Sequence, residues 1–324
     1  MVQLSRLGWR LALAAAALLL LGGGTARLVA STASAGVAGT TTGVEIVGST
    51  RTGGIERVVD VLTRGLGLPL PAGTRVHVYA TREAFRRGLV QDAAMGEEGA
   101  DELAAFAIGM ARPGRALLNG RLADGSSEWL RLVAHELTHV SQFELAGGEG
   151  RAEQWLAEGM AERVAFQALE RLGAGSLATH RRLALVRVRK QPAFAHGRLD
   201  LTTLGSPRDF TLRHQREGSV ETYHLSFLLA DYLIQEHGFA KMVEYFGRLR
   251  RQSSEAAFTA AFGENLAAFE TNALTYLQAV TGVGGPEMAP QVDRAKGLRP
   301  LGLPGQRSSR PGEAVARLDF RPGS

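Results

Sequence analysis

The sequence predicts an α+β protein in which a small N-terminal sheet packs on a largely helical half. Two observations support this division. Residues 75–79 alternate polar and apolar side chains, which is the period of a strand with one buried face. From about Ser126 onward, apolar residues recur every three or four positions, as they do in helices. The chain has 324 residues, 45% of them hydrophobic, which is enough to bury a substantial core.

Local patterns place the elements in order along the chain. A helix is predicted at 54–64, a strand at 75–79, and a second helix that begins near Thr81. Residues 104–110 and 115–118 flank a Pro-Gly turn and predict a pair of strands. Helices of the second half are predicted at 126–145, 151–172, 221–236, 239–251, 254–262 and 266–280.

The N-terminus has the pattern of an export signal. Arg6 and Arg10 precede an apolar run at 11–21, which is about half of the ~20 residues that a membrane-spanning helix needs. The small residues at 33–35 complete the pattern of a secretory signal peptide that is cleaved after Ala35. The alternative is an uncleaved N-terminal anchor. Either way, we expect the folded part of the protein to lie outside the cytoplasm.

The folded domain is predicted at 36–285, followed by a disordered basic tail at 286–324 that is rich in Pro and Gly. The net charge of +5 does not lie on the domain, because residues 1–35 carry +3, residues 290–324 carry +4 and residues 36–289 about −2. This distribution argues against a nucleic-acid partner. The chain has no cysteine, which excludes disulfides, thiol catalysis and a lipid anchor attached through cysteine.

Residues 135–139 have the sequence His-Glu-Leu-Thr-His. Side chains four apart on a helix share one face, so His135 and His139 can reach a single metal ion. Zinc accepts two imidazoles and a carboxylate and keeps a fourth position for water in catalytic sites. The alternative for this segment alone is an ordinary surface helix that happens to carry two histidines and a glutamate.

A second segment supplies the carboxylate. Eighteen residues separate His139 from Glu158, which lies within the sequence Trp-Leu-Ala-Glu-Gly-Met-Ala-Glu at 155–162. The two segments together resemble the gluzincin metallopeptidases, and residues 36–285 more loosely resemble the small bacterial peptidase-MA-like proteins. The resemblance implies a zincin-like site on two packed helices, with Zn²⁺ as cofactor, Glu158 as third ligand and Glu136 as the general base that activates water.

Three further residues are candidates for roles in this chemistry. Glu162 is one turn beyond Glu158 and either accepts a hydrogen bond from a ligand imidazole or is a solvated helix residue. Gluzincins commonly use a tyrosine or histidine beyond the third ligand as donor to the developing oxyanion, which makes Tyr223 the first candidate and His224 the second. The alternative for Tyr223 is a buried core aromatic.

The resemblance also implies that an extended peptide pairs with an exposed sheet edge, which we expect at 116–119. The Gly-Ala-Met-Glu-Asn sequence of the aminopeptidase N family is not found before His135, so an endopeptidase is favoured over an aminopeptidase. We therefore expect zinc-dependent hydrolysis of a peptide or protein substrate. The alternatives are a scaffold protein with a vestigial zinc site and a zinc hydrolase that acts on other bonds. Membrane contact is expected only through an uncleaved N-terminal segment, and the sequence indicates no oligomeric state.

Overall fold

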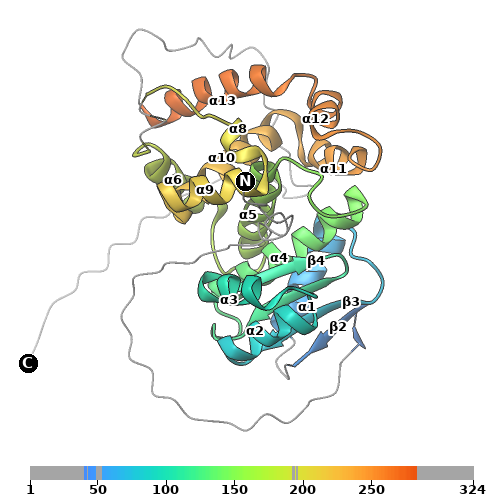
Figure 1. The fold of residues 1–324 in the computed structure, drawn as a ribbon. Helices are drawn as coiled ribbons and strands as arrows, with labels where there is room; N and C mark the ends of the chain where they lie inside the picture. Colours follow the sequence, from blue (N-terminus) through green and yellow to red (C-terminus); the bar gives the residue numbers. More distant parts are fainter. Residues whose placement is uncertain (1–39, 42, 49–52, 192–193, 195, 283–324) are drawn as a thin grey trace, which may run out of the picture. The chain divides into compact units, whose positions relative to one another are not determined.

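The computed structural model describes residues 40–41, 43–48, 53–191, 194 and 196–282, and it confirms the predicted α+β class (Figure 1). The predicted signal peptide or anchor and the predicted tail lie outside the described residues and stay predictions. None of the helices within the described ranges is both long and apolar enough to cross a membrane.

In the described part of the chain the sheet has five strands, in the order β1 (Thr40–Thr41), β2 (Val44–Val47), β3 (Thr74–Tyr79), β5 (Arg115–Asn119) and β4 (Gly109–Arg112). The central strands β2, β3 and β5 are parallel, whereas β1 and β4 pair antiparallel at the two edges. The predicted pair of strands is a hairpin of β4 and β5, and Gly114 turns between them at φ 70°.

Two predictions for this region are wrong. Residues 116–119 are not a sheet edge, because β5 pairs with β3 on one side and with β4 on the other, so that β4 is the edge strand. Residues 104–106 are not part of a strand but end helix α3 (Glu97–Phe106), which the sequence analysis missed. Ala100 and Ala104 lie one turn apart on the buried side of α3, and alanine favours a helix over a strand.

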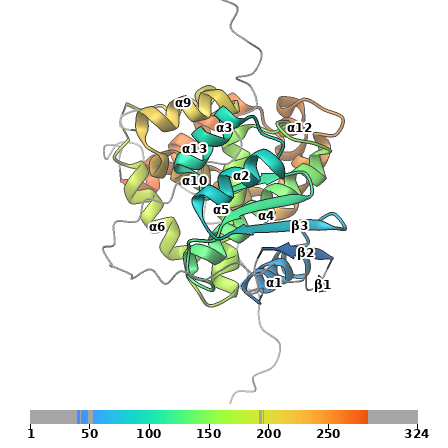
Figure 2. The same cartoon turned by 60° about the horizontal axis from the view of Figure 1, so that its bottom comes forward.

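Helices cover both faces of the sheet (Figure 2). Side chains alternate along a strand, so Met110 and Leu117 lie on one face, where they pack with α2 (Arg82–Gln91) and α3. Ala111, Ala116 and Leu118 lie on the opposite face, within the main hydrophobic core. Helix α1 (Gly53–Asp60), continued by one π-helical turn at Val61–Gly65, and helix α4 (Ser127–Ala146) contribute to that core.

The helical half starts with α4, whose ends the sequence predicted. Ser126 caps the N-terminus by accepting a hydrogen bond of 3.2 Å from the Trp129 amide, and Gly147 ends the helix at φ 69°. The remaining helices are α5 Gln154–Arg171, α6 Leu177–Val188, α8 Thr202–Gly205, α9 Pro207–Glu217, α10 Ser219–His237, α11 Phe239–Arg248, α12 Ser254–Phe262 and α13 Leu266–Thr281.

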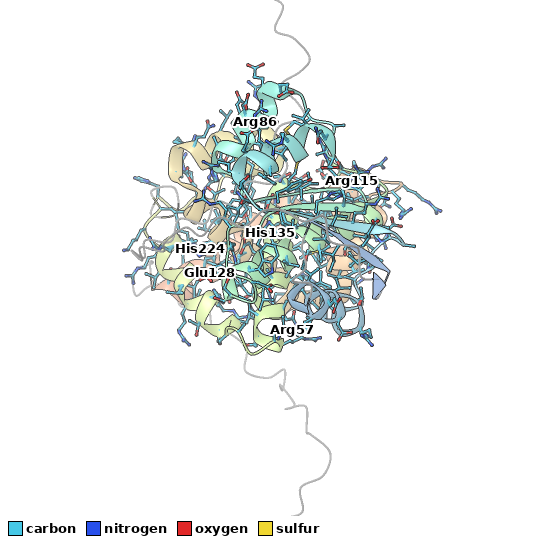
Figure 3. The ribbon with its side chains drawn as sticks, turned by 90° about the horizontal axis from the view of Figure 1, so that it is seen from below. Arg57, Arg86, Arg115, Glu128, His135 and His224 are labelled. Carbon is cyan, nitrogen blue, oxygen red and sulfur yellow. The ribbon has the colours of Figure 1, made fainter. Side chains whose placement is uncertain are left out.

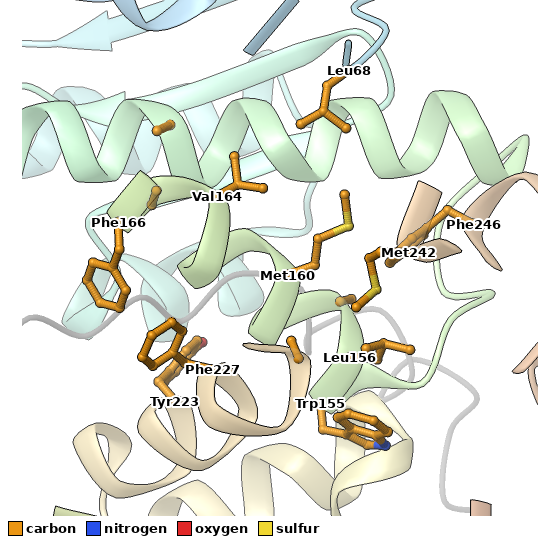
Figure 4. Packing of buried hydrophobic residues seen from close by; sticks show 14 of the residues in the cluster. Leu68, Trp155, Leu156, Met160, Val164, Phe166, Tyr223, Phe227, Met242 and Phe246 are labelled. Atoms are coloured by element: carbon orange, nitrogen blue, oxygen red, sulfur yellow. The ribbon is translucent and has the colours of Figure 1, made fainter. Parts of the chain in front are cut away.

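Helix α5 is the centre of this half, because α4 packs on one side of it and α10 on another. Figure 4 shows Met160 and Val164 of α5 on the side toward α4, and Phe227 of α10 beneath α5. Gly159 is the point of closest approach to α10. A Cβ atom at this position would overlap the backbone carbonyl oxygen of Ser226, so only glycine lets the two helices pack at this distance.

A buried ion-pair network joins α5, α6 and α10. Asp231 of α10 is 1% exposed and accepts from Arg163 of α5 at 2.8 Å and from Arg181 of α6 at 2.7 Å. Gln235, one turn along α10, donates to the same carboxylate at 2.7 Å. The carboxylate therefore fixes the positions of two helices against α10.

We predict that Asp231→Ala will lower the free energy of unfolding by about 3–5 kcal/mol, because it leaves Arg163 buried without its counter-charge. Glu244→Ala is the matched control, since Glu244 pairs with Lys241 and Arg248 in solvent on α11. Exposed pairs contribute about 0–1 kcal/mol. Denaturant unfolding of both variants measures the difference, and equal losses would contradict a structural role for the Asp231 network.

Candidate metal centre

The histidines predicted as ligands lie deep in the molecule, where α4 packs on α5. Figure 3 shows His135 near the middle of the molecule, whereas Arg57 and Arg86 lie toward its outside. His135, His139 and Glu158 are each at most 2% exposed. They are the only described residues that form a group able to hold a metal ion.

The three donor atoms form a nearly equilateral triangle. His135 Nε2 and His139 Nε2 are 3.1 Å apart, and Glu158 Oε2 lies 3.3 Å from the first and 3.4 Å from the second. Bonds of about 2.0–2.1 Å to a tetrahedral zinc ion would set neighbouring ligand atoms about 3.3 Å apart. Glu158 Oε2 is buried and has no hydrogen-bond partner among the described residues, as expected of an atom that ligates a metal. The residues present therefore fit a metal ion.

A neighbouring amide orients two of the ligands. Gln142 donates to the Ala157 carbonyl at 2.9 Å, so its own oxygen is left to accept from His139 Nδ1 at 2.8 Å. This arrangement puts the proton of His139 on Nδ1 and turns the lone pair of Nε2 toward the centre of the triangle. Gln154 donates to Glu158 Oε1 at 2.8 Å, which leaves Oε2 for the metal.

Glu162 is buried beside His135, so the second of the two alternatives for it, a solvated helix residue, is wrong. Glu162 is 1% exposed, and its Oε1 lies 3.2 Å from His135 Nδ1. Arg131, one turn before His135 on α4, holds the Glu162 carboxylate with two nitrogens, one of them at 3.1 Å. The Arg131 guanidinium in turn lies 5.3 Å from the centre of the Phe166 ring.

Opposite charges decide the protonation of this cluster in the absence of a cation. Burial would raise the pKa of Glu158, but His139 and His135 lower it to about 2. Burial would lower the pKa of His135, but Glu158 and Glu162 raise it to about 10. Glu162 has a pKa well below its usual range despite its burial, because Arg131 and His135 favour its charged form. A metal ion that binds here displaces the proton of His135.

Glu136 follows His135 on α4, and its carboxylate is buried close to both histidines. It is fully buried, and neither of its carboxylate oxygens has a hydrogen-bond partner among the described residues. Burial raises its pKa to about 6, against the opposing effect of His135 and His139. The edge strand β4 passes directly over the carboxylate at Gly109, where a Cβ atom would lie 2.5 Å from Glu136 Oε1. Because glycine has no side chain, Gly109 leaves space for the Glu136 carboxylate.

The structure places Tyr223 beside the cluster. Tyr223 is 6% exposed, and its ring centre is 6.3 Å from that of His135. Phe210 and His214 of α9 surround the same ring at 5.5 and 6.0 Å. His224 is the next residue on α10, and its side chain therefore projects from the helix about 100° further around the axis than that of Tyr223. Tyr223 is therefore both a core aromatic and a neighbour of a candidate ligand.

Sequence analysis missed Gln142, Gln154, Arg131 and Gly109. The first three lie three or four residues from a candidate ligand, a spacing that puts them on the same helix face. This spacing could have been recognised in the sequence. The contact of Arg131 with Glu162 could not, because Glu162 lies on another helix. Gly109 has no local signal, since its contact with Glu136 depends on how the sheet packs on α4.

Comparisons with known proteins return no relative: no family model, no curated protein and no solved structure matches the chain.

We predict that His135→Ala, His139→Ala and Glu158→Ala will each lower metal occupancy of the purified protein sharply from about one ion per chain, because each removes one of three protein ligands. His237→Ala is the matched control, since His237 lies at the far end of α10 and contacts Phe262. Elemental analysis by mass spectrometry measures the occupancy and identifies the metal. Full occupancy in Glu158→Ala would contradict the assignment of the third ligand.

Proposed function

We propose that the protein is a zinc-dependent hydrolase of peptide bonds, with a zincin-like two-helix site of the gluzincin type. The observation that supports this most strongly is the combination of the donor triangle with the buried, unpartnered carboxylate of Glu136 beside it. A purely structural zinc site has four protein ligands and no need of a free base. Two imidazoles and one carboxylate suit zinc and leave one position for the reaction.

Each residue then has a distinct task. Zinc held by His135, His139 and Glu158 would supply Lewis acidity to a carbonyl group and would lower the pKa of a neighbouring water toward ~7. Glu136 accepts the proton of the attacking water and passes it to the leaving amine. Glu162 and Gln142 keep the two imidazoles in their ligating orientation. Tyr223 donates its hydroxyl proton in a hydrogen bond to the oxyanion that develops on the substrate carbonyl.

The substrate is proposed to be an extended peptide that pairs with β4. This strand is the edge of the sheet nearest the site, and Gly109 on it touches the Glu136 carboxylate. Because Glu136 and the three ligands are at most 2% exposed, cleavage also requires an opened conformation that admits the peptide. The absence of the aminopeptidase sequence before His135 favours internal cleavage over removal of single residues.

A diverse peptide mixture incubated with the metal-loaded protein tests the proposal, with products identified by mass. Internal cleavage that stops when the metal is chelated supports an endopeptidase, whereas stepwise loss of N-terminal residues would indicate an aminopeptidase. Hydrolysis of simple esters or amides without any peptide cleavage would indicate a zinc hydrolase of another kind. No hydrolysis of any of these substrates at full zinc occupancy would favour a scaffold protein with a vestigial site.

We predict that Glu136→Gln will retain zinc and lose about 10²–10⁴-fold of its peptidase activity, because an amide cannot accept a proton from water. Glu128→Gln is the matched control on the same helix, near its N-terminus, and should keep both zinc and activity. Activity assays together with metal analysis separate loss of chemistry from loss of zinc. A Glu136→Gln variant as active as the parent would refute the general-base role.

We predict that Tyr223→Phe will lower kcat about tenfold and leave KM nearly unchanged, because the hydroxyl stabilises the transition state more than the bound substrate. Removal of an oxyanion donor typically costs ~10²–10³ in kcat, and zinc compensates part of this loss. Tyr232→Phe, on the same helix but stacked on Tyr276, is the matched control. Unchanged kcat in Tyr223→Phe, with a large decrease in His224→Ala at full zinc occupancy, would assign the role to His224.

A further inference from the structure

Helix α6 lies at the periphery of the helical half and has two different faces (Figures 1 and 2). Its inner face buries Leu177, Ala184 and Val188 in the core. Arg181 also belongs to this inner side, because its guanidinium pairs with Asp231 of α10. The inner face of α6 is therefore in contact with the rest of the domain through core packing and one ion pair.

The outer face of α6 combines aliphatic and basic side chains. Leu183 is 54% and Val186 49% exposed, which makes them two of the five large hydrophobic residues that the described structure leaves exposed. They are three positions apart and therefore lie side by side on the helix. Because each residue turns the helix by 100°, the exposed Arg182 and Arg187 lie on the two sides of this pair. Arg189 and Lys190, also exposed, follow at the C-terminal end of the helix.

The segment that contains α6 is basic, unlike the domain as a whole. Residues 171–199 contain seven arginine or lysine residues and no acid, although residues 36–289 together have a net charge of about −2. Four of the seven are the exposed Arg182, Arg187, Arg189 and Lys190. Arg187, Arg189 and Lys190 form no ion pair with any described residue. On α11, by contrast, Lys241 and Arg248 are both paired with Glu244. Arg187, Arg189 and Lys190 are thus available to an external anion.

We propose that the outer face of α6 docks on the surface of an anionic lipid membrane. Leu183 and Val186 enter the boundary between headgroups and acyl chains, while the flanking arginines bind lipid phosphates and keep their aliphatic stems against the apolar pair. Each basic residue close to an anionic leaflet adds to the attraction. The contact is peripheral and independent of the hydrolytic function, and it would hold the protein at a membrane even after removal of the N-terminal segment.

Other partners fit this face less well. A second copy of the chain, packed about a two-fold axis, would bring like charges together across the contact. A nucleic acid would satisfy the arginines but would offer no apolar surface to Leu183 and Val186. An anionic bilayer satisfies both kinds of side chain at once.

The test is sedimentation of the full-length protein with phosphatidylcholine vesicles that contain or lack phosphatidylserine. We expect binding to depend on phosphatidylserine and to fall roughly a hundredfold in the triple variant Arg182→Gln/Arg187→Gln/Arg189→Gln, at about 1 kcal/mol per charge. The matched control is Arg57→Gln/Arg64→Gln/Arg87→Gln, which removes the same charge from exposed positions in the sheet half and should bind nearly as well as the parent.

The aliphatic pair has its own control. Leu183→Ser/Val186→Ser should lower binding about tenfold, whereas Leu212→Ser, which changes an aliphatic residue that is 52% exposed on α9, should not. Residues 11–21 are common to all variants and contribute equally to each. Equal losses in the two arginine triples, or binding without preference for phosphatidylserine, would overturn the proposal. Preferential binding of duplex DNA at the same salt, or self-association abolished by Leu183→Ser, would assign the face to a different partner.

Discussion

The structure depends above all on the packing of α4 against α5, which brings three carboxylates into one buried space. Glu136, Glu158 and Glu162 are each at most 1% exposed, and among the described residues Arg131 is the only arginine or lysine that pairs with any of them. Burial of uncompensated charge costs several kcal/mol per ion. The donor atoms of two imidazoles and a carboxylate converge at 3.1–3.4 Å and could hold a divalent cation, which would offset that cost and stabilise the contact between the helices.

The rest of the fold positions groups around this contact. The sheet packs on α4 so that Gly109 of β4 leaves space for the Glu136 carboxylate, and Gly159 of α5 lets α10 approach closely enough to bring Tyr223 beside His135. Gly159 is required because a Cβ atom would overlap backbone, whereas a Cβ atom at Gly109 would displace the side chains of Glu136 and Leu132. Asp231 then fixes α10 to α5 and α6. Packing in three different places thus determines the geometry of one site.

The parts of this arrangement that follow from local spacing were predictable from the sequence. The helix from Ser126 to Gly147 and the shared face of His135 and His139 follow from residue types and their separations, whereas Glu158 as the third member of the cluster was implied by the resemblance to the gluzincins. What could not be predicted depends on contacts across elements. The order of β4 and β5 in the sheet decides which strand is the edge, and both the position of Gly109 and the pairing of Arg131 with Glu162 arise only once the elements have packed.

The most direct test of a metal centre at this contact is X-ray absorption spectroscopy of the zinc-loaded protein. A centre built from His135, His139 and Glu158 predicts about four nitrogen or oxygen neighbours at about 2.0–2.1 Å, together with the outer-shell scattering of two imidazole rings. A first shell of oxygen atoms alone, without imidazole scattering, would place the ion elsewhere on the protein and contradict the assignment.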